Sequence, residues 1–450
     1  MLHQCQTLWA QLGRPLMDIL YCFVFGGQFQ PQLQLALGLV CLFILGLLVA
    51  KEWRLSSSER AFFMCFIATF PFLCNVFGFE TGKFSMPLAY LLSACSWTMV
   101  RNSAKGLRIL AVAVFCCGVL LYQTSVNFLI ALALLSILFD SELCANAAVF
   151  RRLLAKSLYQ LVFLIIPGLI LYVSLSEAVR FVAKSGYNER YGWIGGLETP
   201  GGFYWQIRDI LAHYKHFLLP GHPLLPNFFG VAMLFAAAVV ACGCCLRLTS
   251  RDANLSSFQA MAILVFLPLS YLSVWATDLP VSGSLLGDGY RHTYPVVLVF
   301  SVTFLFALRI LGSFTICRVV GQLAMIAVVA SFVVVDASWA FDTHRLSVFE
   351  LSVANRVAQK IEESSAANRV VYFVGGLPSG SRPLGLSPRG YDVLGSGLDN
   401  PGSAAAVFRS IGLRFESPTA SQLPLCQRLV QDANPVALSS ECNVINLSRL

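Results

Sequence analysis

The sequence is short of charge. Of its 450 residues only 12% are Asp, Glu, Lys or Arg, whereas soluble domains carry about 25%. No charged residue occurs between Arg108 and Asp140, and further apolar runs recur up to residue 340. Many of these runs approach the ~20 residues that cross a bilayer as a helix. The shortage therefore argues against a large soluble core and predicts a polytopic α-helical membrane protein.

Several kinds of site are also missing. The histidines form no cluster, and no Ser-His-Asp or Cys-His arrangement can be defended. Cys242, Cys244 and Cys245 would need a second group of ligands to bind a metal, and none follows. The Gly-Ser-Gly at 395–397 follows no clear strand and opens no helix, so it does not predict a nucleotide site. The net charge of +8 does not indicate nucleic acid, because the basic residues lie just beyond the apolar runs, as in membrane proteins.

The apolar run from Ile109 to Phe139 decides the topology. A single helix of this length would overshoot the ~30 Å hydrocarbon core, yet the run is short for two full spans. Polar residues at 122–127 (YQTSVN) interrupt it. We expect two short helices that meet at a membrane surface, with the polar residues at the tip. Two passes also place all the basic loops on one side, which is then cytoplasmic.

Ten spans follow from this choice. They are expected at 33–50, 61–79, 86–100, 108–122, 124–139, 157–175, 227–246, 258–276, 292–310 and 319–338. The sequence thus divides into an external amphipathic segment (1–32), a transmembrane domain (33–340) and a periplasmic domain (341–450). Since no helix precedes residues 1–32 to carry them outside, we expect that a first span is missing, through truncation or a misassigned start.

Two external regions have further features. The loop 176–226 is long and rich in aromatic residues and glycine, which favours anchoring at the membrane interface, although aromatic rings also stack on sugars. The tail alternates helix and strand signals, including a strand at 369–374, and predicts a small C-terminal α/β domain. Its only cysteines, Cys426 and Cys442, would form a disulfide in an oxidising compartment.

Ionisable residues near the outer surface are the candidates for chemistry. Glu80 and Lys83 fall in one short external loop, and Asp288, Arg291 and His292 precede the ninth span. All lie on the face that carries the polar residues at 122–127. A carboxylate could act as general base, and cations could hold a phosphate leaving group. Each residue taken singly also fits an ordinary loop charge, and His292 fits an interfacial side chain.

The sequence resembles the type II Gtr family of serotype-converting O-antigen glucosyltransferases, relatives of the GT-C membrane glycosyltransferases. Four stretches carry the resemblance: Trp9 with 13–16 (GRPL), 72–87 (FLCNVFGFETGKFSMP), 121–127 (LYQTSVN) and 289–291 (GYR). Their order and spacing are more specific than any one of them. The tail also has the layout of the family.

The resemblance implies a GT-C-like membrane fold and a reaction in the bacterial inner membrane. A sugar, glucose in this family, would pass from a polyprenyl-phosphate donor to a lipid-linked glycan, the O-antigen of lipopolysaccharide, on the periplasmic face. The catalytic candidates are Glu80 and Asp288. The candidates for substrate binding are Arg14, Lys83, Tyr122, Gln123, Asn127, Arg291 and His292. The sequence leaves open whether a divalent metal ion takes part.

One departure and two alternatives accompany this hypothesis. The family places an acidic pair after its first span, and the chain begins beyond that point, so Glu80 is the best remaining acid. A transporter or flippase for lipid-linked sugars is the main alternative. It would predict charged or broken helices at mid-membrane, whereas the expected spans are nearly free of charge. The other alternative is a non-catalytic membrane protein of envelope assembly.

Overall fold

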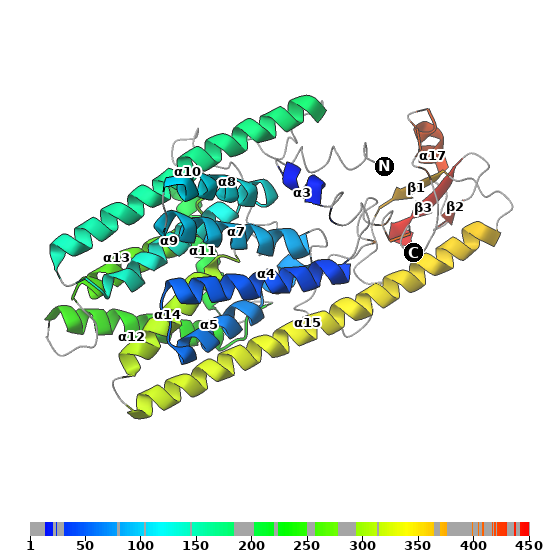
Figure 1. Ribbon diagram of the computed structural model, residues 1–450. Helices are drawn as coiled ribbons and strands as arrows, with labels where there is room; N and C mark the ends of the chain where they lie inside the picture. Colours follow the sequence, from blue (N-terminus) through cyan, green and yellow to red (C-terminus); the bar gives the residue numbers. More distant parts are fainter. Residues whose placement is uncertain are drawn as a thin grey trace. The chain divides into compact units, whose positions relative to one another are not determined.

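The computed structural model contains two units, divided between residues 335 and 336, and is drawn in Figure 1. The described residues are 14–20, 24, 31–78, 82–102, 105–144, 146–183, 202–219, 224–249, 257–277, 294–312, 315–363, 370–375, 398, 404, 407–408, 416, 418–419, 421–429, 436–437 and 442–449.

The first unit is built from helices. They are α3 (Pro15–Ile19), α4 (Pro31–Glu52), α5 (Ser57–Thr69), α6 (Leu73–Gly78), α7 (Gly82–Asn102), α8 (Lys105–Leu121), α9 (Ser125–Ser141), α10 (Ala147–Ala183), α11 (Gly202–Leu218), α12 (Phe229–Thr249), α13 (Ser257–Ser273) and α14 (Val296–Leu311). The helix α15 (Thr315–Glu363) begins in this unit and ends in the second.

Length and composition make this a helical membrane protein. Within the described residues, four helical segments are long and apolar enough to cross a membrane: Gln32–Glu52, Ala147–Val182, Phe229–Thr249 and Ile316–Ile361. Four shorter apolar segments accompany them: Gly106–Leu121, Ser125–Ser141, Ser257–Ser273 and Val296–Leu311. The run 109–139 forms α8 and α9, joined at Tyr122–Thr124, which confirms the expectation of two short helices.

The helices of the first unit run side by side (Figure 1). α7 packs against α4 and α8, α8 against α10, and α9 against α13. α9 lies at the centre, because nearly all of its residues are buried. Large exposed apolar side chains on α4, α10 and α12 are what a lipid-facing surface requires. The polar turn between α8 and α9 therefore lies at one end of the buried helix α9.

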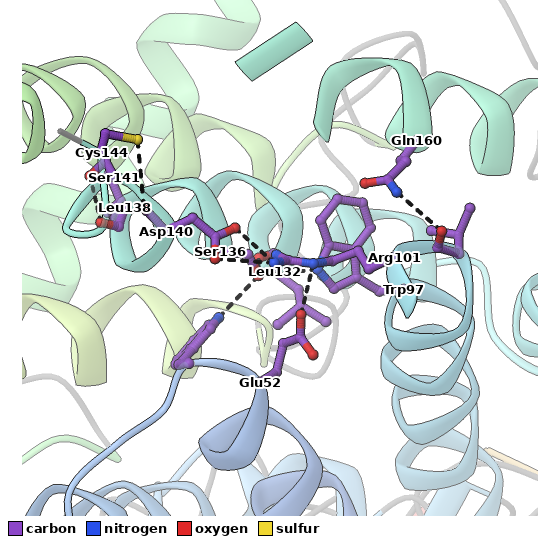
Figure 2. Close-up of polar contacts among 12 residues, drawn as sticks. Glu52, Trp97, Arg101, Leu132, Ser136, Leu138, Asp140, Ser141, Cys144 and Gln160 are labelled. Carbon is purple, nitrogen blue, oxygen red and sulfur yellow. Dashed lines mark hydrogen bonds and ion pairs between the residues drawn. The ribbon is translucent and has the colours of Figure 1, made fainter. Parts of the chain in front are cut away.

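At the opposite end of α9, an ion-pair cluster joins three helices. Arg101 of α7 binds Glu52 of α4 (Nε–Oε1 2.8 Å) and Asp140 of α9 (Nη2–Oδ2 2.8 Å). Figure 2 shows this arrangement beside the indole of Trp97, which donates to the Ser136 hydroxyl (3.1 Å). We call Glu52, Arg101 and Asp140 the Arg101 cluster. It fixes the C-terminal end of α9.

Three expected elements differ in the structure. The span expected at 61–79 is interrupted after Thr69, because Pro71 disfavours helical geometry at the residue before it and Phe70 is extended (φ −65°, ψ 122°). The segment expected as the loop 176–226 contains the end of α10 and the helix α11. The span expected to end at 338 continues as α15 to Glu363, because a helix satisfies its own backbone and need not stop at a membrane surface.

The second unit contains a three-stranded sheet with the order β1-β3-β2. β1 (Val371–Val374) pairs in parallel with β3 (Asn443–Asn446), and β2 (Val436–Ala437) pairs antiparallel with β3. The strand expected at 369–374 is thus present as β1. The remaining helices are α17 (Leu423–Leu429) and the 3-10 helix η6 (Leu447–Arg449). One apolar core packs the last turns of α15 against β1 and β3, through residues such as Val357, Phe373 and Ile445.

Candidate functional site

The turn between α8 and α9 is closed by the backbone and anchored from a neighbouring helix. The Ser125 N–H donates to the Tyr122 carbonyl (3.0 Å) and the Val126 N–H to the Gln123 carbonyl (3.1 Å). The Thr124 hydroxyl hydrogen-bonds the Tyr90 hydroxyl of α7 (3.1 Å). The polar residues that interrupt the apolar run therefore form a fixed corner.

Arg14 reaches this corner from the N-terminal segment. Its Nε donates to Gln123 Oε1 (2.8 Å), and its guanidinium carbon lies 4.4 Å from the centre of the Tyr122 ring. A cation over an aromatic face at this distance is attracted by the ring. Arg14 is the residue before α3, and Pro15 suits the first position of that helix. Two sequence motifs 109 residues apart thus meet in space.

Tyr172 of α10 completes the group, which we call the turn cluster: Arg14, Tyr122, Gln123 and Tyr172. The Gln123 Nε2 donates to the Tyr172 hydroxyl (3.2 Å). Because the same amide accepts from Arg14 and donates to Tyr172, its orientation is determined by its partners. Tyr172 was not among the predicted site residues. The only available signal was a phenol within an apolar helix, which usually needs a hydrogen-bond partner.

The electrostatics of the turn cluster favour an anion. Arg14 is only 8% exposed, and its described partners, Gln123 and Tyr122, are both neutral. Burying a cation without a negative partner is unfavourable. Among the residues that the structure describes, these partners of Arg14 carry no negative charge, so a phosphate or carboxylate could pair with it, and the planar guanidinium can bind two oxygens. The cluster can therefore recognise an anionic group but does not itself contain a base.

Asn127 lies in the first turn of α9 and bonds Thr277, four residues beyond the end of α13. Its Nδ2 donates to Thr277 Oγ1 (2.8 Å), and its Oδ1 accepts from the Thr277 backbone N–H (2.8 Å). Asn127 is fully buried. The contact holds the segment that leaves α13 against the start of α9.

Of the other five predicted site residues, the structure describes only Lys83. Lys83 is half-buried in the first turn of α7. Glu80, Asp288, Arg291 and His292 lie outside the described residues. The structure thus brings together Arg14, Tyr122 and Gln123, with Asn127 in the first turn of α9. Among the described residues, no three His, Cys, Asp or Glu side chains form a metal site.

The comparison with known families rests on the part of the chain that contains this site. Residues 1–308 match the family model described as glucosyl transferase GtrII. The chain belongs to this glucosyl transferase family. No curated protein and no solved structure gives a significant match. The matched residues include the whole turn cluster and the Asn127–Thr277 contact, whereas α15 and the second unit lie beyond them.

Membership in the family makes the chain a membrane glycosyltransferase, as the sequence resemblance indicated. The catalytic assignments within the family's reaction are not contained in the match.

Proposed function

We propose that the protein transfers a glucosyl residue from a polyprenyl-phosphate donor to a lipid-linked glycan, the O-antigen of lipopolysaccharide. The reaction takes place on the periplasmic face of the bacterial inner membrane, within a GT-C-like fold. The family match and the apolar helices support a membrane glucosyltransferase. The distribution of basic residues in the sequence supports the periplasmic side.

The observation that carries this proposal is the fixed, buried guanidinium of Arg14. Tyr122 lies against its face and Gln123 accepts from its Nε, so little side-chain freedom remains to be lost on binding. In this proposal Arg14 binds the donor phosphate and stabilises the negative charge that grows on it as the sugar leaves. Gln123 and Tyr122 orient Arg14, and Tyr172 orients Gln123.

The transfer itself is a single displacement. An acceptor hydroxyl oxygen attacks the anomeric carbon, and the bond from that carbon to the phosphate oxygen breaks with its electron pair remaining on the phosphate. The hydroxyl proton passes to a carboxylate, for which Glu80 and Asp288 are the candidates. Lys83, Arg291 and His292 are candidates for further contacts to the phosphate or acceptor.

The first test compares the surface polysaccharide of host cells with and without the gene. We expect the mass of each repeat unit to increase by one hexose when the gene is present. An unchanged repeat in cells that contain the protein in their membranes would contradict the proposal.

The same assay tests Arg14. We expect Arg14→Gln to lower the rate of transfer by about 10²–10³-fold, as for loss of a donor that stabilises transition-state charge. Arg14→Lys should retain part of the rate, because an ammonium carries the charge but not the bidentate fork. Arg356→Gln removes an exposed charge from α15 and serves as the matched control. Equal rates for Arg14→Gln and the control would remove Arg14 from the mechanism.

A further inference from the structure

The helix α11 (Gly202–Leu218) differs from the spans around it. It does not belong to the long or the shorter apolar segments, and it carries Arg208, Asp209 and Lys215 within 17 residues. A short helix with this composition fits the membrane interface better than the membrane interior.

One face of α11 is packed against the ends of neighbouring spans. The Tyr214 hydroxyl donates to the Tyr271 carbonyl in the last turn of α13 (2.6 Å). The His213 ring lies 5.3 Å from the ring of Trp275, just beyond α13. The ring of Phe217, which is fully buried, lies 5.2 Å from that of Phe72. These contacts fix both the depth and the rotation of α11.

Two further contacts show which end of the bundle this is. A Cβ added to Gly230, in the first turn of α12, would lie 1.8 Å from the Leu218 carbonyl oxygen, so only glycine permits this approach of α11 to α12. Thr277 follows Trp275 and bonds Asn127 in the first turn of α9. α11 therefore lies at the same end of the helices as the turn cluster, where the spans leave the hydrocarbon.

The opposite face of α11 is exposed, and apolar or aromatic residues alternate on it with basic residues. Tyr204, Arg208, Leu211 and Lys215 follow one another at intervals of three or four residues, which places them along one side of the helix, and Leu219 continues this spacing just beyond its end. Tyr204 is 66% exposed, Leu211 58% and Leu219 50%. Arg208 and Lys215 are exposed as well. Apolar or aromatic side chains thus alternate with cations along a single stripe.

We propose that this stripe is a binding surface for the anionic headgroups of phospholipids in the outer leaflet. The alternation fits a helix that lies in the interface, with leucine and tyrosine among the acyl chains and cations at the phosphates. Arg208 and Lys215 lie two helical turns apart, so each contacts a separate headgroup. The function of the surface is to hold the outer ends of α12 and α13 at the membrane surface, beside the site of transfer.

The test uses the full chain in nanodiscs that contain equal amounts of phosphatidylglycerol and phosphatidylcholine. Native mass spectrometry of the released protein measures the ratio of the two retained lipids. We expect an excess of phosphatidylglycerol for the unaltered protein. The preference should fall by about fivefold for each charge removed in Arg208→Gln/Lys215→Gln, since one cation near an anionic surface contributes about this factor.

Two control variants separate this role from general charge and from folding. Arg356→Gln/Lys360→Gln removes two exposed charges from the last turns of α15, and it should leave the ratio unchanged. Arg208→Lys/Lys215→Arg keeps both charges and should keep the preference. The proposal is overturned if Arg208→Gln/Lys215→Gln retains the full excess, or if the α15 variant loses it equally. It is also overturned if the stripe retains a polyprenyl phosphate while showing no preference for phosphatidylglycerol.

Discussion

At the scale of single residues, the contact between Asn127 and Thr277 is the most sharply defined. Two hydrogen bonds of 2.8 Å join a fully buried amide to a residue 150 positions away. We expect Asn127→Ala to destabilise the protein by ~1–3 kcal/mol, because it leaves the half-buried hydroxyl and N–H of Thr277 without this partner. Thr277→Val removes only the hydroxyl and should cost ~0.5–1.5 kcal/mol. Unfolding midpoints of the purified full chain measure both effects.

A double-mutant cycle provides the decisive comparison for this pair. Residues in direct contact should show a coupling energy of ~0.5–3 kcal/mol. Thr249→Val is the matched control, since the Thr249 hydroxyl is exposed and bonds only within its own helix. Strict additivity of Asn127→Ala and Thr277→Val would show that the contact does not contribute to stability.

The residues of the turn cluster show what a sequence can and cannot reveal. Arg14, Tyr122 and Gln123 could be chosen as candidates from the sequence because each stands in a short motif with unusual polarity. Their contact was not predictable, since 109 residues separate Arg14 from Gln123 and no spacing rule relates them. Tyr172 escaped notice for the same reason: its role depends on which side of α10 faces the turn, and this is decided by tertiary packing.

At the scale of elements, the apolar helices could be predicted from the sequence where charge and hydropathy change together, whereas the number of spans stays a prediction. The two short helices α8 and α9 followed from the polar residues at 122–127. The interruption after Thr69 could have been read from Pro71, but the apolar character of the run concealed it. The helix α11 lies in the segment expected as a loop. It could not be predicted from hydropathy, because its residues form a stripe at helical spacing and not an apolar run.

The Arg101 cluster gives a prediction at this scale, because it joins three helices. Arg101 is 18% exposed, Glu52 11% and Asp140 14%. We expect Arg101→Ala to cost ~3–5 kcal/mol, since it leaves two largely buried carboxylates without their cation. Unfolding midpoints of the full chain provide the measurement, and the positions of the side chains can be followed in Figure 2.

Neutralising the carboxylates distinguishes this explanation from a simple loss of packing. Glu52→Gln and Asp140→Asn, added to Arg101→Ala, should restore most of the lost stability, because the uncompensated charges are gone. Lys51→Ala removes an exposed cation from the last turn of α4 and should have little effect. If the triple variant is as unstable as Arg101→Ala, the ion pairs are not the reason for the loss.

At the scale of the whole molecule, the chain consists of two units with separate hydrophobic cores. The family match ends at residue 308, before α15, so the transferase assignment rests on the first unit. The second unit has its own sheet and a disulfide between Cys426 and Cys442, the two cysteines that the sequence suggested as a pair. The disulfide joins α17 to the residue that precedes β3.

The separate cores predict separate unfolding. The disulfide links residues 16 positions apart, and a closed loop of about this length stabilises a fold by ~3 kcal/mol through the unfolded state. We expect Cys426→Ala/Cys442→Ala, or reduction, to lower the temperature at which the second unit becomes susceptible to protease. The first unit should be unaffected, because none of the cysteines that the structure describes in it forms a disulfide. Limited proteolysis at increasing temperature, with the fragments identified by mass, separates the two units.

Cys65→Ala, at an exposed free cysteine, controls for the loss of a thiol. If both units lost protection at one temperature in the double variant, the two units would unfold together, and the prediction of separate unfolding would be wrong.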